Sequence, residues 1–270
     1  MKSIMLRRKI EKGVVYGWRS LNHKCCIIYC YIDWILVGRK RIIEKINSCV
    51  GEVKLRPFNI RGWHNGTSTF IAIDRDQKKY YVKKSTNKKA ILSEIESINF
   101  LRKSIRTNED AFDVCDIICS TDTFVVESFL PGNQLSNKTF VDSLDEDEKE
   151  MIISKLQLIV EKFHQIGFIH ADFTPKNIII NSGNINIIDF EYSIMLDSRK
   201  RENSISKNNN KLRDIGSTYA MGIGVVDDAY SLSQIAKYLI PDIISTNYNL
   251  WRNINTLIGL HQCDLLHNSL

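Results

Sequence analysis

The chain has 270 residues, 43% of them hydrophobic, and a formal net charge of +6. This composition is sufficient for a hydrophobic core and excludes disorder of the whole chain. The Lys and Arg residues are spread along the sequence, with local clusters at 2–12, 39–45 and 199–211. Such a distribution is typical of a solvated surface, and the alternative is attraction to nucleotide, acidic lipid headgroups or an anionic acceptor.

The seven cysteines favour a reduced, cytoplasmic protein. They are odd in number, lack paired CxxC spacing and lie in or beside apolar runs, so we interpret them as free thiols in the core. A zinc site around His23 and the cysteines that follow it would lack a second ligand pair at the usual spacing. Neither a signal peptide nor a spanning helix is expected, because the N-terminus is charged and the apolar run at 25–37 is too short. The expected location is the cytoplasm, with the inner face of a membrane as an alternative.

An antiparallel sheet is predicted for the first half of the chain. Short apolar runs are separated by polar or glycine-containing turns, as in a meander. An amphipathic helix is expected over 89–103, where apolar residues recur at helical spacing. The five expected strands are at 53–60, 69–74, 80–83, 114–120 and 123–129. Pro131 and Gly132 then break the chain.

The second half is predicted to be mainly helical. The acidic cluster at 145–148 precedes a long helix over 149–165, which Gly167 ends. Two short strands, at 177–180 and 185–188, flank a turn. The polar stretch 197–210 is expected to be a mobile loop, and a last helix spans 228–239.

Three polar residues carry the chemistry. Asp172 and Asn177 lie five residues apart on a tight loop that contains Pro175, and Asp189 follows a strand of isoleucines. Each residue alone would be an ordinary turn residue, but at this spacing their side chains can converge. Two carboxylates and an amide provide oxygen ligands for Mg²⁺ and an acceptor for a hydroxyl proton, as phosphoryl transfer requires.

This pattern resembles the catalytic loop and metal-binding motif of the protein-kinase-like superfamily, His-x-Asp-x-x-x-x-Asn followed by Asp-Phe-Gly. The resemblance implies that Asp172 is the catalytic base or orients the hydroxyl group. It implies that Asn177 and Asp189 are metal ligands and that His170 is a structural residue of the loop. ATP and Mg²⁺ are the implied cofactors.

The resemblance extends upstream, to the residues expected to bind nucleotide. Lys83, on the strand at 80–83, would hold the α- and β-phosphates, and Glu94 on the following helix would pair with it. Strand alternation leaves Lys84 as a rival of Lys83, and Glu96 remains an alternative to Glu94.

Two further segments resemble nucleotide-binding parts of the superfamily. Gly62 and Gly66 belong to a degenerate phosphate-covering loop that has two of the usual three glycines. Backbone groups from Glu127 to Phe129 would bind adenine. The side chain of Glu127 could instead be exposed to solvent and take no part in binding.

Downstream, residues 216–221 resemble the end of an activation segment. Asp228 would be a buried acid that holds backbone amides, and its neighbour Asp227 could serve instead. The implied fold class is α+β, with a two-lobed protein-kinase-like fold. Its expected parts are an N-terminal extension of unassigned role at 1–51, a sheet lobe with one helix at 52–130, and a mainly helical, truncated lobe at 131–270.

Several residues depart from the protein-kinase pattern, and they bear on which acceptor is phosphorylated. Ala171 stands where an arginine often follows the loop histidine, so control by loop phosphorylation is not expected. Thr174 replaces a lysine that is common in serine/threonine kinases, and Glu191 replaces the glycine of Asp-Phe-Gly. Asp-Phe-Glu-Tyr resembles choline and aminoglycoside kinases, and the His-Ala-Asp loop resembles lipopolysaccharide-core sugar kinases. The spacing of Asp189 and Asp228 resembles that of small bacterial-type protein kinases.

The implied function is therefore transfer of the γ-phosphate of MgATP to a hydroxyl acceptor, either a lipopolysaccharide-core-type sugar or a protein Ser/Thr. The alternative is a catalytically silent pseudokinase that acts as a nucleotide-binding scaffold, against which the intact motif argues. No nucleic-acid partner is expected, because no recognition helix or stacking motif accompanies the charge. We interpret residues 1–51 as a structural cap, with a peripheral membrane-surface contact or a partner face as alternatives.

Overall fold

A computed structural model describes residues 24–25, 27–28, 31–32, 39–60, 63, 66–105, 112–195 and 227–258. By their internal contacts, the residues form two compact units. The first comprises 1–91 and 117–129, and the second comprises 92–116 and 130–270. The helix α3 (Lys88–Ser104) crosses from the first unit to the second. The predicted loop at 197–210 and the segment 216–221 lie outside the described residues.

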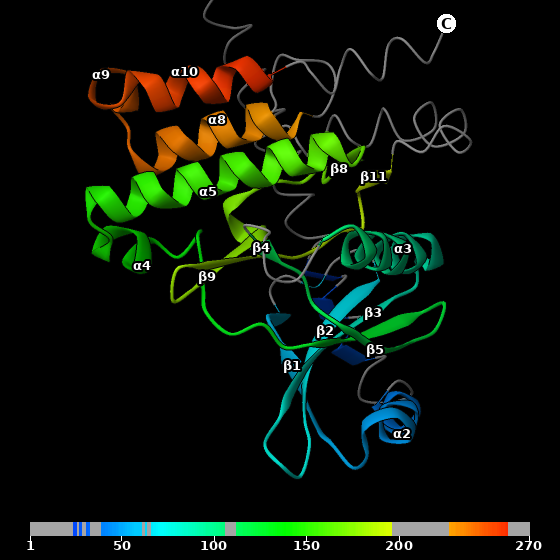
Figure 1. Ribbon diagram of the computed structural model, residues 1–270. Helices are drawn as coiled ribbons and strands as arrows, with labels where there is room; N and C mark the ends of the chain where they lie inside the picture. Colours follow the sequence, from blue (N-terminus) through cyan, green and yellow to red (C-terminus); the bar gives the residue numbers. More distant parts are fainter. Residues whose placement is uncertain are drawn as a thin grey trace, which may run out of the picture. The chain divides into compact units, whose positions relative to one another are not determined.

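The first unit contains a five-stranded antiparallel sheet (Figure 1). Its strands, in spatial order, are β1 (Lys54–Phe58), β2 (Thr67–Ile73), β3 (Lys79–Ser85), β6 (Phe124–Ser128) and β5 (Ile117–Ser120). The predicted five-stranded antiparallel sheet is confirmed, and β1, β2 and β3 follow one another as the expected meander, whereas β6 and not β5 pairs with β3. The expected strand at 114–120 begins only at Ile117, since residues 114–116 are in no strand. Before them, Phe112–Asp113 forms a separate strand, β4, that pairs with β10 in the second unit.

Alternation along β2 gives this strand one buried side. Buried and partly buried residues alternate along the whole of β2, so Phe70 and Ala72 point to the same side. The helix α2 (Arg39–Val50) packs Ile42 and Ile46 into the same core cluster. This part of the N-terminal extension is therefore a structural cap on the sheet.

The cysteines differ from the core prediction. Cys115 is buried, but Cys25 and Cys49 are exposed, so the prediction that they are core residues is wrong. Cys49 lies near the end of α2, on a turn that the core does not cover, and its Sγ contacts the Lys45 carbonyl oxygen at 3.3 Å. The four described cysteines, these three and the partly buried Cys119, are all free.

Cys119 should react slowly in the folded chain. Burial, followed by a hydrogen bond and charge interaction with Cys49, raises its pKa to about 12. Because the thiolate is the nucleophile, we expect iodoacetamide at pH 8 to modify Cys119 at least about tenfold more slowly in the native protein than in urea. Peptide mass spectrometry of timed samples measures both rates, and equal rates would contradict the prediction.

In the second unit, three helices stack in one layer: α8 (Asp228–Leu239) lies between α5 (Glu146–Gln165) and α10 (Tyr248–Leu257) (Figure 1). The acidic cluster, expected at the N-terminus of α5, provides its N-cap and first turn. Asp145 accepts a hydrogen bond from the Glu148 backbone N–H, and the Glu148 side chain accepts one from the Asp145 N–H. This capping box fixes the helix start at Glu146.

Short strands and helices complete the second unit. They include one four-stranded sheet and one strand pair. The sheet consists of β4, β10 (Asn184–Ile187), β9 (Ile178–Asn181) and β7 (Asn133–Gln134), and the pair of β8 (Phe168–Ile169) with β11 (Ile194–Met195). The remaining helices are α4 (Lys138–Ser143), α9 (Ile243–Thr246) and the 3₁₀ turn η3 (Pro175–Asn177). Among the described helices, none has the length and apolar character needed to cross a membrane.

Candidate active site

The loop between β8 and η3 is anchored by a buried carboxylate. Asp228, at the start of α8 and 0% exposed, accepts hydrogen bonds from the backbone N–H groups of His170 at 2.7 Å and Ala171 at 3.1 Å. Its neighbour Asp227 instead caps α8, accepting from the N–H of Ala229 at 2.8 Å. Of the two acids considered from the sequence, Asp228 therefore holds the loop.

His170 is a buried, neutral component of the same loop. Its Nε2 lies 3.0 Å from the carbonyl oxygen of Ile188, and its Nδ1 accepts a hydrogen bond from the Asp172 backbone N–H at 3.3 Å. These partners indicate the tautomer with the proton on Nε2. Burial lowers the pKa of His170 to about 4. The imidazole thus connects the loop to Ile188, the residue that follows β10.

Asp172 and Asn177 are brought together as expected. The Asn177 Nδ2 donates to both the backbone oxygen and the Oδ2 of Asp172, each at 2.9 Å. This orients the carboxylate and leaves the Asn177 side-chain oxygen as the atom able to serve as a ligand. Burial, followed by the negative charge of Asp189, raises the pKa of Asp172 to about 7. A carboxylate with that pKa suits proton transfer near neutral pH.

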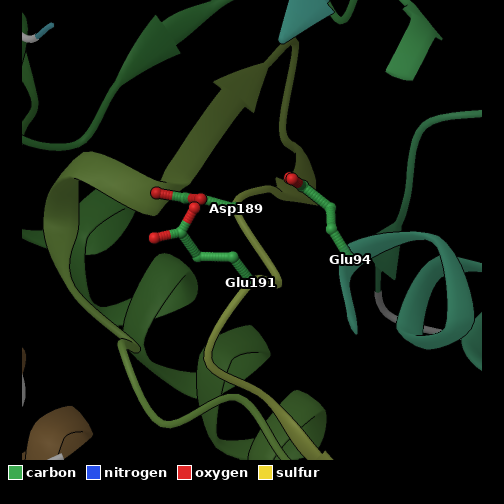
Figure 2. A group of neighbouring side chains, drawn as sticks. All are labelled: Glu94, Asp189 and Glu191. Atoms are coloured by element: carbon green, nitrogen blue, oxygen red, sulfur yellow. The ribbon is translucent and has the colours of Figure 1, made fainter. Parts of the chain in front are cut away.

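Asp189 lies in an acidic cluster that the sequence analysis did not anticipate. One carboxylate oxygen from each of Glu94, Asp189 and Glu191 lies within 4.8 Å of the other two (Figure 2). Asp189 lies two residues after the end of β10, and its φ of 66° is in the left-handed region. From the sequence, Glu191 was considered only because it replaces the glycine of the motif. Its position two residues after Asp189 was the signal that could have indicated the proximity of the two carboxylates.

Comparison with known families matches residues 60–217 to the protein kinase domain. The chain belongs to the protein kinase family. This confirms the family resemblance and the α+β kinase-like fold class expected from the sequence. Members of this family use ATP with Mg²⁺.

Similar proteins match only part of this kinase. Citron rho-interacting kinase of Rattus norvegicus is 32% identical over 80 residues, which are 28% of this chain and 4% of that protein. Serine/threonine-protein kinase CBK1 of Pneumocystis carinii is 36% identical over 73 residues, 26% of this chain and 14% of that protein. The chain thus spans a small fraction of these relatives. The solved streptomycin-ATP-APH(2")-IIa ternary complex has a TM-score of 0.48 and 15% identity, with 82% of this chain and 97% of that chain covered.

The sequence left two choices open, Lys83 or Lys84 and Glu94 or Glu96, and in each choice one residue is buried. Lys83 on β3 is 5% exposed, whereas Lys84 is only partly buried. On α3, Glu94 is 2% exposed and Glu96 is exposed. Burial of a charged side chain is unusual without a specific role, so both preferences from the sequence are retained.

The other predicted nucleotide-binding residues lie in the first unit. Glu127 on β6 is buried, and Phe129, partly buried, has the Lys79 ammonium 5.7 Å from its ring centroid. Gly66 has a φ of 78°, and a Cβ at this position would lie 2.1 Å from Thr86 Oγ1. Only glycine fits there without movement. Gly62 lies outside the described residues.

The donor set of the second unit fits the Mg²⁺ used by the family. Asp189, Glu191 and Glu94 offer carboxylate oxygens, and Asn177 offers an amide oxygen, which are the hard ligands that Mg²⁺ prefers. The predicted ligand Asp189 thus has two acids beside it. Glu94 was expected to pair with Lys83, and Glu191 was not assigned.

Proposed function

We propose that this chain is an ATP-dependent kinase that transfers the γ-phosphoryl group of MgATP to a hydroxyl acceptor. The observation that supports it most is Asp172, whose carboxylate is oriented by Asn177 and whose pKa is raised to about 7 beside Asp189. In this proposal the Asp172 carboxylate is the proton acceptor, beside Asp189, which would hold the metal.

In this proposal the Asp172 Oδ1, which is not the oxygen bonded to Asn177, accepts the hydroxyl proton. The acceptor oxygen forms a bond to the γ-phosphorus as the bond from phosphorus to the β,γ-bridging oxygen breaks, and ADP leaves. Asn177 and Asp189 would hold Mg²⁺, which neutralises charge on the phosphates. Lys83 would bind the α- and β-phosphates. His170 and Asp228 fix the position of the loop.

We propose two acceptor classes, each favoured by a specific observation. The match to serine/threonine-protein kinases favours a protein Ser or Thr hydroxyl. The His-Ala-Asp loop, with Thr174 in place of lysine, favours an anionic sugar of lipopolysaccharide-core type. A peripheral membrane contact of the N-terminal extension would accompany the second class. Cytoplasmic residence, with the inner face of a membrane as its alternative, belongs to the same proposal.

The test is transfer of radiolabel from γ-labelled ATP with Mg²⁺ to lipopolysaccharide extract, to a generic protein substrate, or to no added acceptor. We expect label in one acceptor fraction. Because Lys83 is buried and Lys84 is not, Lys83→Met should lower kcat/KM at least about 100-fold, and the matched Lys84→Met should change it less than about threefold.

The thermal stability of the same samples separates this proposal from the pseudokinase alternative. A ligand at 100 times its Kd adds about 2.7 kcal/mol to the free energy of unfolding. Stabilisation by MgATP without label in any fraction would favour a silent scaffold. An equal loss of activity in both lysine variants would reject Lys83 as the specific phosphate-binding residue.

A further inference from the structure

Two of the described cysteines meet where helix α2 packs against one edge of the five-stranded sheet. α2 contacts β5, which is the last strand at that edge (Figure 1). Cys49 lies in the last turn of α2, and Cys119 lies on β5. The two residues are about 70 positions apart in the sequence, and both belong to the first unit. The fold, not the sequence spacing, therefore brings their side chains together.

An irregularity in β5 directs Cys119 toward the helix. The pairing of β5 with β6 shifts register between Ile117 and Cys119, which interrupts the usual alternation of side chains along a strand. Ile118 and Cys119 accordingly both pack against the core cluster to which α2 contributes. On this side of the strand the Cys119 thiol forms a hydrogen bond with the thiol of Cys49.

The two thiols differ in their access to solvent. Cys49 is exposed, whereas Cys119 is partly buried. The Cys49 Sγ donates a hydrogen bond to the Lys45 carbonyl oxygen at 3.3 Å, which is a weak bond because a thiol is a weak donor. Rotation of the Cys49 side chain away from Lys45 therefore costs little, and it is the movement needed to reach an S–S distance of about 2.05 Å. A reagent from solvent should react with Cys49 first.

We propose that Cys49 and Cys119 are a redox-modification site, at which a small-molecule disulfide such as oxidised glutathione forms a reversible bond between α2 and β5. The Cys49 thiolate attacks one sulfur of the small disulfide and releases its first thiol. The Cys119 sulfur loses its proton to solvent, attacks the Cys49 sulfur and releases the second thiol. The two protein thiols thereby lose two electrons, which the small disulfide gains.

The second exchange is the slower one. Burial raises the pKa of Cys119 to about 12, so little of its thiolate is present at neutral pH. The contact with Cys49 offsets this, because attack within one chain has a high effective concentration. The inference does not depend on the proposed function, since the exchange uses neither ATP nor a residue of the candidate active site.

The test is incubation of the reduced full chain with oxidised glutathione at pH 8, blocking of free thiols with N-ethylmaleimide in urea, and peptide mass spectrometry. We expect linked peptides that contain Cys49 and Cys119. Cleavage before Asp116 separates Cys119 from Cys115 and so assigns the bond. Because a bond across about 70 residues restricts the unfolded chain, the melting temperature should rise by at least about 5 °C, and dithiothreitol should reverse the rise.

Three variants make the test specific. Cys49→Ser should abolish both the linked peptides and the rise in melting temperature, and so should Cys119→Ala, which places no hydroxyl group in the partly buried position. Cys25→Ser is the matched control, because it removes another exposed cysteine and should leave both results unchanged.

The yield of the bond should also depend on the fold. With the glutathione incubation itself carried out in urea, we expect at least about a tenfold lower yield, because the packing of α2 on β5 is lost. Equal yields in native and unfolded chains would overturn the inference. Glutathione that remains attached to Cys49 without a link to Cys119 would also overturn it, as would a bond from Cys49 to a different cysteine.

Discussion

Asp172→Asn is expected to lower the turnover number for phosphoryl transfer by at least about 1,000-fold while the chain remains folded. The amide has nearly the same shape as the carboxylate and can keep the contact with Asn177, but it cannot take the hydroxyl proton. Single-turnover transfer from labelled ATP measures the effect. Retention of more than about a tenth of the wild-type rate would exclude Asp172 as the base.

The same variant has a pH signature in stability. Asp172 has a pKa of about 7 in the folded chain, above the value of about 3.9 for an unfolded aspartate. A raised pKa contributes stability that is full below about 3.9 and is lost as the pH rises through about 7. Asparagine does not titrate, so the melting temperature of Asp172→Asn relative to wild type should increase from pH 4 to pH 8.

Scanning calorimetry across this pH range makes the comparison, with Asp142→Asn on the exposed part of α4 as the control. The control should show no such trend. The activity of the wild type should follow the opposite direction, with kcat/KM rising as the pH passes about 7, because the base acts as the carboxylate. A melting-temperature difference that is constant with pH would show that the Asp172 carboxylate is not destabilised by its neighbours.

Elements with a regular period were predictable from the sequence. The alternation in β2 and the apolar spacing in α3 place their buried faces directly, and the five-stranded sheet follows from five such runs. Element starts depend on single side-chain hydrogen bonds. The acidic run was expected at the N-terminus of α5, but the helix was predicted to begin three residues late, at 149, because the capping box of Asp145 and Glu148 brings that run into the first helical turn.

The site was predictable as far as its local spacing. Asp172 and Asn177 share one short loop, so their contact follows from the sequence. The convergence of Glu94 with Glu191 does not, because it joins residues almost a hundred positions apart and depends on the left-handed conformation of Asp189. The division of roles between Asp227 and Asp228 was also open, since adjacent residues at a helix start differ only in direction.

The contact of Asp228 with the loop backbone gives the largest expected effect on the free energy of unfolding. Asp228→Asn replaces a carboxylate that accepts two backbone N–H bonds by an amide with one oxygen and one NH₂ group. The NH₂ group faces an N–H donor, so one buried backbone N–H loses its partner in a site that is 0% exposed. We expect a loss of about 2 to 4 kcal/mol in the free energy of unfolding at pH 8, measured by urea denaturation.

Asp227→Asn is the matched control, because asparagine caps a helix about as well as aspartate and the change should cost less than about 1 kcal/mol. The two variants have the same chemistry and adjacent positions, so any difference between them reports the loop contact rather than the loss of a charge. Asp228→Asn should also lower phosphoryl transfer, since the N–H groups that it releases belong to His170 and Ala171, directly before Asp172. Equal stability losses in both variants would show that Asp228 contributes to α8 alone and does not hold the catalytic loop.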